Sequence, residues 1–456
     1  MKGLKVGVSG IRGIVDEALS PETVLNFCLS FGTIMNKGKV IVSRDTRISG
    51  YMYKNIVKAA LLSTGCSCVD LDVCPTPTTQ IMVKELKADG AVIITASHNP
   101  IQYNGLKFVN KDGLFLNARE RENLLELYKS KSFAQVNPKE MKTSVCDNSA
   151  VERHMKKVFK LIKPDAIRKR KFKVAYDCCG GAGSVVTPLL MKKLGVKPTA
   201  LNDKPNGFFP HTPEPVPKNL TQICLAVKKN KCDVGFAQDP DADRLAIIDE
   251  TGRAIGEEYT LALAVRFILK KNPKSTIVTN LSTTRAIDDI AAKYQAKVVR
   301  TAVGEMNVVE QILKKKAIIG GEGNGGVIWP AIHPCRDSIA AMMIVLDCMA
   351  REKKKLSEIL AEIPQYKIIK HSVACSFEDA QMVARELKER YSLEKINTID
   401  GIKIDLKEGW VHVRPSNTEP IMRIIAEAKD EVEAQKLIGK ISKDIEEIIK
   451  AAEMAH

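Results

Sequence analysis

The sequence predicts an α/β protein built from three similar sections, with a smaller α+β section at its C-terminal end. Short β-branched runs alternate with amphipathic segments up to about residue 365, and this order starts three times at similar intervals. Strands that alternate with helices favour largely parallel sheets covered by helices. After residue 366, alternating runs are joined by short turn sequences, which favours an antiparallel sheet.

The first section, residues 1–148, has a regular strand–helix order. Its strands are rich in valine and isoleucine, and its second helix ends on a glycine, a common last residue of helices. The predicted elements are strands at 39–46, 68–74 and 91–97 and helices at 21–35 and 53–65.

The order returns in the second section, residues 149–253, and in the third, residues 254–365. The elements are carried by "FKVAYDCCGGAG", "VVTPLLMKKLG" and "DVGFAQDPDADRLAIIDETG", then by "STIVTNLS", "TRAIDDIAAKY" and "AKVVRTAVG". In the fourth section, residues 366–456, the dipeptides "DG" and "EG" predict hairpin turns before one long amphipathic helix at 430–452. Linkers are predicted near 145–150, 249–256 and 363–367.

Composition indicates a folded, reduced protein. Of 456 residues, 45% are apolar, and no window approaches the roughly 20 apolar residues of a membrane span. The N-terminal "MKGLKVGVSGIRG" lacks the apolar core of a secretory signal, so we expect it to begin the fold. The twelve cysteines form no paired CxxC motif and are expected to be reduced thiols in the cytoplasm.

A net charge of +16, from 70 basic and 54 acidic residues, makes nucleic-acid binding conceivable. However, the lysines lie in short helical runs such as "KLIKPDAIRKRK", and no basic arm is present. We therefore expect solvated helix faces that attract small anions, with no nucleic-acid or membrane partner.

The loop "QDPDADR" carries a candidate metal site. Asp239, Asp241 and Asp243 alternate, so an extended loop places all three carboxylates on one side. Their mutual repulsion is relieved by a cation, and oxygen ligands suit Mg²⁺ or Ca²⁺. An EF-hand is rejected, although Glu250 stands at the twelfth position, because Arg244 replaces the sixth-position glycine and the flanks resemble strands.

The loop "TASHNP" places Ser97 at the predicted carboxyl end of a buried strand, where open α/β sheets bind ligands. A serine hydroxyl needs a base or a metal to react. A phosphoryl group on Ser97, held near a divalent cation, would account for both loops, although an isolated "SHNP" is also an ordinary turn.

Two further loops offer polar groups to a sugar phosphate. In "GGEGNGG", glycines surround Glu322 and Asn324, whose carboxylate and amide suit sugar hydroxyls. The loop "RPSNTEP" suits a phosphate dianion, with Arg423 a few residues further on. Its candidate ligands are Arg414, Ser416, Asn417 and Thr418. Each loop taken alone is equally compatible with a plain turn.

Together, "GVSGIRG", "TASHNP", "DPDADR", "GEGNGG" and "RPSNTEP" resemble the ordered signatures of the α-D-phosphohexomutase superfamily over nearly the whole chain. The resemblance implies three related α/β domains and a smaller α+β domain around a central cleft. It also implies a phosphoserine at Ser97, one Mg²⁺ on Ser97 and the three aspartates, and contacts from Arg244 and the two loops to substrate.

The implied reaction is two phosphoryl transfers through a bisphosphorylated hexose, which is both intermediate and activator. Arg12 and Lys107 match the family's basic residues near the serine, and Lys107 or His98 is the candidate general acid/base. A phosphosugar substrate and a monomer or homodimer are expected. A phosphoglucosamine mutase is favoured, with phosphomannomutase or phosphoglucomutase as alternatives.

The chain departs from the family pattern in two places. The sugar loop ends in "NGG", where many members have "SGH", so His333 is a candidate replacement; "VGEMN" at 303–307 also differs from "VGDR". Two other classes remain open. A metal-dependent phosphatase would release inorganic phosphate, and a non-catalytic sugar-phosphate binder would need neither Ser97 nor the aspartates.

Overall fold

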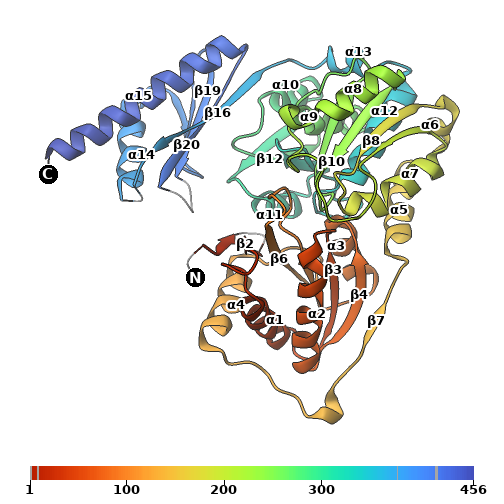
Figure 1. The fold of residues 1–456 in the computed structure, drawn as a ribbon. Coiled ribbons are helices and arrows are strands. Elements are labelled where there is room, and N and C mark those ends of the chain that lie inside the picture. Colours follow the sequence, from red (N-terminus) through yellow and green to blue (C-terminus); the bar gives the residue numbers. More distant parts are fainter. Residues whose placement is uncertain (1–2, 8–9, 377, 416–419, 456) are drawn as a thin grey trace. The chain divides into compact units, whose positions relative to one another are not determined.

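The computed structural model describes residues 3–7, 10–376, 378–415 and 420–455, and Figure 1 shows the chain as a ribbon. The chain forms two compact units. The first contains Met1–Ile268 and Ile318–Ala361, and the second contains Leu269–Ala317 and Glu362–His456. The first unit is therefore discontinuous in sequence.

A seven-stranded sheet begins the first unit, in the order β1-β2-β6-β5-β3-β4-β7. Its central strands β4, β3 and β5 are parallel, as predicted. The sheet is nevertheless mixed, because the pairs β5–β6, β6–β2 and β2–β1 are each antiparallel. The strands are β1 Lys5–Gly7, β2 Gly10–Ile14, β3 Lys39–Arg44, β4 Ser67–Val73, β5 Gly90–Ile94, β6 Tyr103–Asn110 and β7 Ser144–Cys146.

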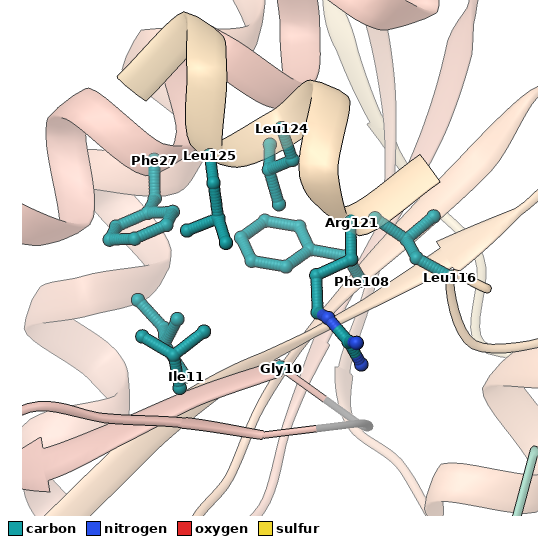
Figure 2. Close-up of a pocket in the computed structure, with 9 residues that line it drawn as sticks. Gly10, Ile11, Phe27, Phe108, Leu116, Arg121, Leu124 and Leu125 are labelled. Carbon is teal, nitrogen blue, oxygen red and sulfur yellow. The ribbon is translucent and has the colours of Figure 1, made fainter. Parts of the chain in front are cut away.

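Helices cover both faces of this sheet. Alternate residues of its buried strands, such as Val92 and Ile94, join α1, α2 and α4 in one apolar core, while α3 packs against β3 and β5. The helices are α1 Pro21–Met35, α2 Ile48–Ser63, α3 Thr76–Glu85 and α4 Ala118–Ser130. Phe27, Phe108 and Leu125 are among the residues that line a gap of about 10 Å³, and Figure 2 shows their side chains. The gap holds one water at most, so it is no sugar site.

The second sheet of this unit has the order β11-β10-β8-β9. Strands β9, β8 and β10 are parallel, and β11 returns antiparallel to β10. Its strands are β8 Lys173–Asp177, β9 Lys197–Leu201, β10 Val234–Gln238 and β11 Leu245–Asp249. Its helices are α5 Ala150–Leu161, α6 Asp165–Arg170, α7 Thr187–Leu194 and α8 Thr221–Asn230. The strands on both sides of the aspartate loop confirm that it is not an EF-hand.

A later segment completes the first unit. The hairpin of β14 Ile319–Glu322 and β15 Gly326–Ile328 is followed by α12 Ser338–Glu352 and α13 Leu356–Leu360. Helix α12 is buried along most of its length, and its N-cap Asp337 also bonds the buried His154 Nε2 at 2.8 Å. Helix α9, Glu257–Lys271, crosses the boundary between the units.

The second unit contains a parallel strand pair and a five-stranded antiparallel sheet, β16-β20-β19-β18-β17. The predicted "DG" and "EG" turns join β17 to β18 and β18 to β19. The elements are β12 Thr276–Asn280, α10 Ala286–Lys293, β13 Lys297–Thr301, α11 Glu305–Lys315, β16 Lys367–Ala374, α14 Asp379–Arg390, β17 Lys395–Asn397, β18 Ile402–Asp405, β19 Gly409–Pro415, β20 Ile421–Ala428 and α15 Glu431–Ala455.

All twelve cysteines are free thiols, and only Cys146 is exposed. Within the described residues, no helix combines the length and apolar character that crossing a lipid bilayer requires.

A buried lysine makes the stability of the second unit depend on pH. Lys403 is 6% exposed, its Nζ donates to Leu281 O at 3.1 Å, and it lies 4.2 Å from the centre of the Trp410 ring. Burial, with the nearby Arg300 guanidinium, lowers the pKa of Lys403 to about 7. Above that pH only the unfolded chain holds this proton, up to its ordinary pKa of about 10.4. The free energy of unfolding therefore rises with pH over this window.

We expect Lys403→Met to stabilise the protein most at pH 7 and progressively less toward pH 9. The advantage over wild type should shrink by about 2 kcal/mol across those two pH units, since one proton is worth about 1.4 kcal/mol per unit. Urea unfolding at both pH values measures it. Lys395→Met, whose side chain is 86% exposed on the same sheet, is the control and should give no such trend. An equal advantage at pH 7 and pH 9 would show that Lys403 keeps an ordinary pKa.

Candidate active site

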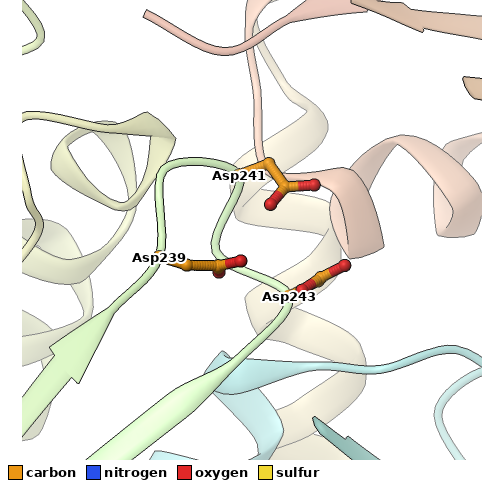
Figure 3. A group of neighbouring side chains, drawn as sticks. All are labelled: Asp239, Asp241 and Asp243. Atoms are coloured by element: carbon orange, nitrogen blue, oxygen red, sulfur yellow. The ribbon is translucent and has the colours of Figure 1, made fainter. Parts of the chain in front are cut away.

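Three aspartates lie together at the turn between β10 and β11. Asp239, Asp241 and Asp243 are each at most 1% exposed, and one oxygen from each lies within 4.8 Å of the others. Figure 3 shows their side chains projecting to the same side of the loop. Ala242 between them has a left-handed backbone, with φ +56°. The carboxylates do lie together, but the loop that carries them is a turn, closed by a hydrogen bond from the Ala242 N–H to Asp239 O at 2.9 Å, and not the extended segment that was predicted.

Two cations face these aspartates from elsewhere in the first unit. Lys107 Nζ lies 2.6 Å from Asp241 Oδ2 and 3.3 Å from Asp243 Oδ2, and Arg336 Nη2 lies 2.7 Å from Asp243 Oδ2. Burial acts to raise the pKa of both carboxyls, but Lys107 lowers the pKa of Asp241 and Arg336 lowers that of Asp243. Burial and the other two carboxylates raise the pKa of Asp239 well above its ordinary value.

The cluster has unused capacity for a cation. Asp241 Oδ1 and Asp243 Oδ1 are buried and find no hydrogen-bond partner in the part of the chain that the structure describes. Burial and the neighbouring carboxylates of Asp243 and Asp241 disfavour the charged form of Asp239 and so raise its pKa, and a bound cation would offset these effects. Three oxygen ligands suit a hard divalent cation. The aspartates could therefore hold one metal ion.

Ser97 lies beside this cluster. It follows β5, is 3% exposed, and its Oγ donates to Asp239 Oδ2 at 3.0 Å. Its backbone is left-handed, with φ +49°, an uncommon conformation outside glycine and one that often marks functional loops. Its N–H donates to Thr95 Oγ1 at 2.9 Å. The loop thus presents the hydroxyl to the carboxylates rather than to solvent.

Two of the predicted basic residues flank Ser97. His98 Nδ1 is 3.4 Å from Ser97 Oγ, and Arg12 Nη1 donates to Asn99 Oδ1 at 3.0 Å. Burial, then Arg244 and Arg12, lowers the pKa of His98 to about 3. The imidazole is consequently neutral near pH 7 and can accept a hydrogen bond. Arg244 joins the group through its backbone N–H, which donates to Asp239 Oδ1 at 3.1 Å.

The glycine-rich segment lies in the β14–β15 hairpin. Glu322 ends β14 and is 4% exposed, and Asn324 Nδ2 donates to Glu322 Oε2 at 3.4 Å. Arg336 Nη1 is 3.4 Å from Glu322 Oε2, so one guanidinium links this hairpin to Asp243 of the aspartate loop. The candidate sugar and metal residues therefore form one continuous network.

The candidate phosphate ligands belong to the second unit. Arg414 on β19 and Arg423 on β20 are directly paired across the strands. Two cations in such a position repel, which an anion between them relieves. Arg414 Nη1 is 3.5 Å from Asp400 Oδ2, a partly exposed pair. Ser416, Asn417 and Thr418 lie outside the described residues.

Four domain profiles match this chain in order. They are phosphoglucomutase/phosphomannomutase α/β/α domain I at residues 3–135, domain II at 152–252, domain III at 256–366 and the C-terminal domain at 372–443. The chain belongs to the phosphoglucomutase/phosphomannomutase family. The fold is accordingly three α/β domains and a C-terminal domain, as predicted, whereas the exact boundaries 1–148, 149–253, 254–365 and 366–456 stay a prediction.

Relatives in this family match end to end. A phosphoglucomutase/phosphomannomutase of Thermococcus kodakarensis is 38% identical over 98% of this chain and all of its own length. A Pyrococcus horikoshii protein named "Probable phosphoglucosamine mutase" is 36% identical over 98% of this chain and 99% of its own. The crystal structure of a family protein from Burkholderia thailandensis shares the fold, with TM-score 0.84 and 22% identity over 98% of this chain and 97% of that one.

Some residues that contact the candidate site were not found from the sequence. Arg47, Asp45 and Thr95 hold the Ser97 loop, and Arg336 joins the two polar loops. The charged "RDTR" directly after the buried β3 was the available signal, because β3 and β5 end at the same sheet edge. His333, suggested for the sugar loop, instead donates from Nε2 to Gly113 O at 2.9 Å and is buried.

Proposed function

We propose that this protein is a phosphohexomutase that interconverts the 1-phosphate and 6-phosphate of a hexose through a phosphoserine at Ser97. The observation that carries the proposal is the 3.0 Å contact between Ser97 Oγ and Asp239 within a buried aspartate cluster. A hydroxyl held there has little use in a mere sugar-phosphate binder. Phosphoryl transfer needs positioning and charge neutralisation, and both are present.

The proposed reaction conserves the phosphoryl group. The Oγ–P bond of phospho-Ser97 breaks as a P–O bond forms to the free hydroxyl of the sugar monophosphate, and that hydroxyl loses its proton to a base. The bisphosphorylated sugar then reorients within the site. Its other O–P bond breaks as that phosphoryl group bonds to Ser97 Oγ, and the sugar oxygen left behind takes up a proton to become the free hydroxyl of the product. Neutral His98, with Nδ1 at 3.4 Å from Ser97 Oγ, is positioned to accept the proton. Burial acts to lower the pKa of Lys107, but Asp241 and Asp243 raise it above its ordinary value, so Lys107 is charged and is the candidate proton donor.

Asp239, Asp241 and Asp243, with Ser97 or its phosphate, would hold one Mg²⁺. Bound there, the ion would neutralise charge on the transferring phosphoryl group. Arg12 on β2 donates to Asn99 and so adds positive charge beside the Ser97 loop, and Arg244 adds positive charge beside Asp243. Lys107, which contacts two of the aspartates, supplies part of the countercharge of the cluster.

Glu322 and Asn324 are proposed to bind the sugar hydroxyls, since both are polar and Glu322 is buried at the glycine-rich turn. We favour glucosamine phosphate as substrate, in line with the name of the P. horikoshii relative. Glucose phosphate and mannose phosphate are the alternatives that the name of the T. kodakarensis relative suggests. A cytoplasmic location and a monomeric or dimeric state stay predictions.

A panel of substrates tests the proposal. The 1- and 6-phosphates of glucose, mannose, glucosamine and N-acetylglucosamine are each incubated with the protein, Mg²⁺ and a trace of glucose 1,6-bisphosphate, and products are followed by ³¹P NMR. Interconversion of at least one pair supports a mutase. Inorganic phosphate as sole product would identify a phosphatase, and binding without conversion would identify a non-catalytic protein.

The "RPSNTEP" loop is proposed to hold the phosphate that does not react. One Ser97 serves both ends of the sugar, so the other phosphate occupies one place in both orientations. Charged hydrogen bonds contribute about 1.5–3 kcal/mol each, so Arg414→Ala should weaken binding roughly ten- to a hundredfold. Calorimetric titration of Ser97→Ala protein, which cannot turn over, measures this with each isomer.

Both isomers should lose comparable affinity in the Arg414→Ala background. Arg390→Ala is the matched control, because Arg390 belongs to the same unit but pairs with Asp444 and Glu447 at the surface. It should leave both affinities unchanged. A loss confined to one isomer would exclude a shared phosphate site.

A further inference from the structure

One fully buried guanidinium lies beneath the Ser97 loop. Arg47 is 0% exposed, and its Nη2 donates to Ser97 O and to Asn99 O, each at 2.7 Å. Its Nη1 donates to Pro100 O, also at 2.7 Å. Three carbonyls of a single four-residue turn thus converge on one side chain. Their oxygens would otherwise lie buried or half-buried beside a carboxylate-rich site.

The guanidinium is itself fixed from two sides. Its Nε donates to Asp45 Oδ2 at 3.0 Å, and the same carboxylate oxygen accepts from Thr95 Oγ1 at 2.7 Å. Phe209 lies over the guanidinium, with 4.7 Å between its ring centre and the Arg47 Cζ. Gly207 packs so closely on Thr46 O that a Cβ there would lie 2.4 Å from that oxygen. Arg47 therefore has one available position.

This arrangement reaches the reactive hydroxyl through the backbone. Thr95 Oγ1 accepts from the Ser97 N–H while Arg47 binds the Ser97 carbonyl, so both peptide groups of Ser97 are held. These bonds maintain the left-handed conformation at φ +49° and thereby direct Oγ to Asp239. Arginine suits the task because its planar fork offers donors in several fixed directions, whereas a lysine offers donors from one point.

We propose that Arg47 is a positioning residue for phosphoryl transfer, which holds Ser97 in the conformation that presents its Oγ to the aspartate cluster. The inference rests on the proposed function, because it assumes that Ser97 carries the phosphoryl group. Arg47 is buried behind the loop and bonds backbone carbonyls, so it acts on the rate of transfer and leaves the contacts of the sugar and of the distant phosphate intact.

The test is Arg47→Lys in the full-length protein, assayed with glucosamine 1-phosphate, a trace of glucose 1,6-bisphosphate and Mg²⁺. A misplacement of about 1 Å can cost a hundredfold in rate, so we expect kcat to fall about a hundredfold. KM should change less than about threefold, since the substitution leaves the residues that bind the sugar and the distant phosphate unchanged. Phosphorylation of Ser97 by glucose 1,6-bisphosphate, followed by intact mass in single turnover, should slow by a similar factor.

Arg266→Lys is the matched control. Arg266 is likewise buried in the first unit, and its Nη1 lies 2.8 Å from Glu352 Oε1 of α12, an ion pair that involves no atom of the Ser97 loop. It should lower the melting temperature without a change in kcat. If Arg47→Lys does not fold, Thr95→Val removes the bond to the Ser97 N–H without loss of charge and should lower kcat about tenfold.

The inference would be overturned by an unchanged kcat in folded Arg47→Lys. If Arg47→Lys does not fold, an unchanged kcat in Thr95→Val would overturn it. Equal losses of kcat in Arg47→Lys and Arg266→Lys would also contradict it. Ser97→Ala separates this from the proposed function. If Ser97→Ala is active, the phosphoserine mechanism fails. If Ser97→Ala is inactive and the Arg47 and Thr95 variants are fully active, only the positioning role fails.

Discussion

Ser97→Ala should lower turnover by about a thousandfold or more, because alanine has no oxygen to carry the phosphoryl group between the two ends of the sugar. Conversion of hexose 1-phosphate to 6-phosphate measures the rate. Intact-protein mass should show a phosphorylated form of the wild type that peptide mapping places at Ser97 and that the variant lacks.

The control for this change is Ser30→Ala. Ser30 is also fully buried, but its Oγ donates to Asn26 O within α1, away from the aspartates. This variant should keep wild-type turnover and its phosphorylated form. Near wild-type activity in Ser97→Ala, or a phosphate mapped to another residue, would contradict the mechanism proposed here.

Removal of the metal should abolish activity, and Asp241→Asn should lower it more than a hundredfold at saturating Mg²⁺. The reason is that the proposed divalent cation would be held by carboxylate oxygens, and an amide is a weaker ligand than a carboxylate. Chelator treatment followed by Mg²⁺ addition measures the first effect. Metal analysis after Mn²⁺ loading should give about one ion per wild-type chain and less in Asp241→Asn, a readout independent of turnover.

Asp249→Asn serves as the control for the metal experiment. Asp249 is also 1% exposed and lies on β11, but at the end of the hairpin away from the cluster, where it pairs with Arg253. It should retain metal and activity. Full activity of wild-type protein after exhaustive chelation, with no metal detected, would remove the metal from the mechanism.

Local sequence was sufficient where one short segment determines the geometry. The three aspartates of one short loop were predicted to form a carboxylate cluster, and they do so because the strands on both sides pair antiparallel and close the loop into a turn. The placement of Ser97 follows from the apolar run of β5, which ends at Ile94, so that only Thr95 and Ala96 lie between the strand and the serine. The antiparallel pairing of β6 with β5 could also have been predicted. The segment between these strands is too short to hold the helical crossover of about a dozen residues that a parallel pair requires.

Contacts between distant segments were beyond the sequence. Arg47 and the Ser97 carbonyl are 50 residues apart, and Arg336 and Asp243 are 93 apart. The segment "RDTR" at the end of β3 marks Arg47 as a candidate but not its partners, and nothing in the local pattern distinguishes Arg336 from the many surface cations of a chain with net charge +16. The motifs identified what the site contains, while tertiary packing decides which buried cations hold it in place.

The first unit is formed by two segments of the chain that are separated by part of the second unit, and this determines the order in which the unit can fold during synthesis on the ribosome. The aspartate loop is synthesised about ninety residues before Arg336, which neutralises Asp243, and before Ser338, whose Oγ donates to Ala242 O at 2.6 Å. A nascent chain that ends before Ile318 therefore has the three carboxylates and Lys107, but lacks Arg336, the second cation that contacts Asp243. Because domains otherwise fold from the N-terminus as they emerge, this site should be among the last parts to become structured. Truncated products would then be left without a competent centre.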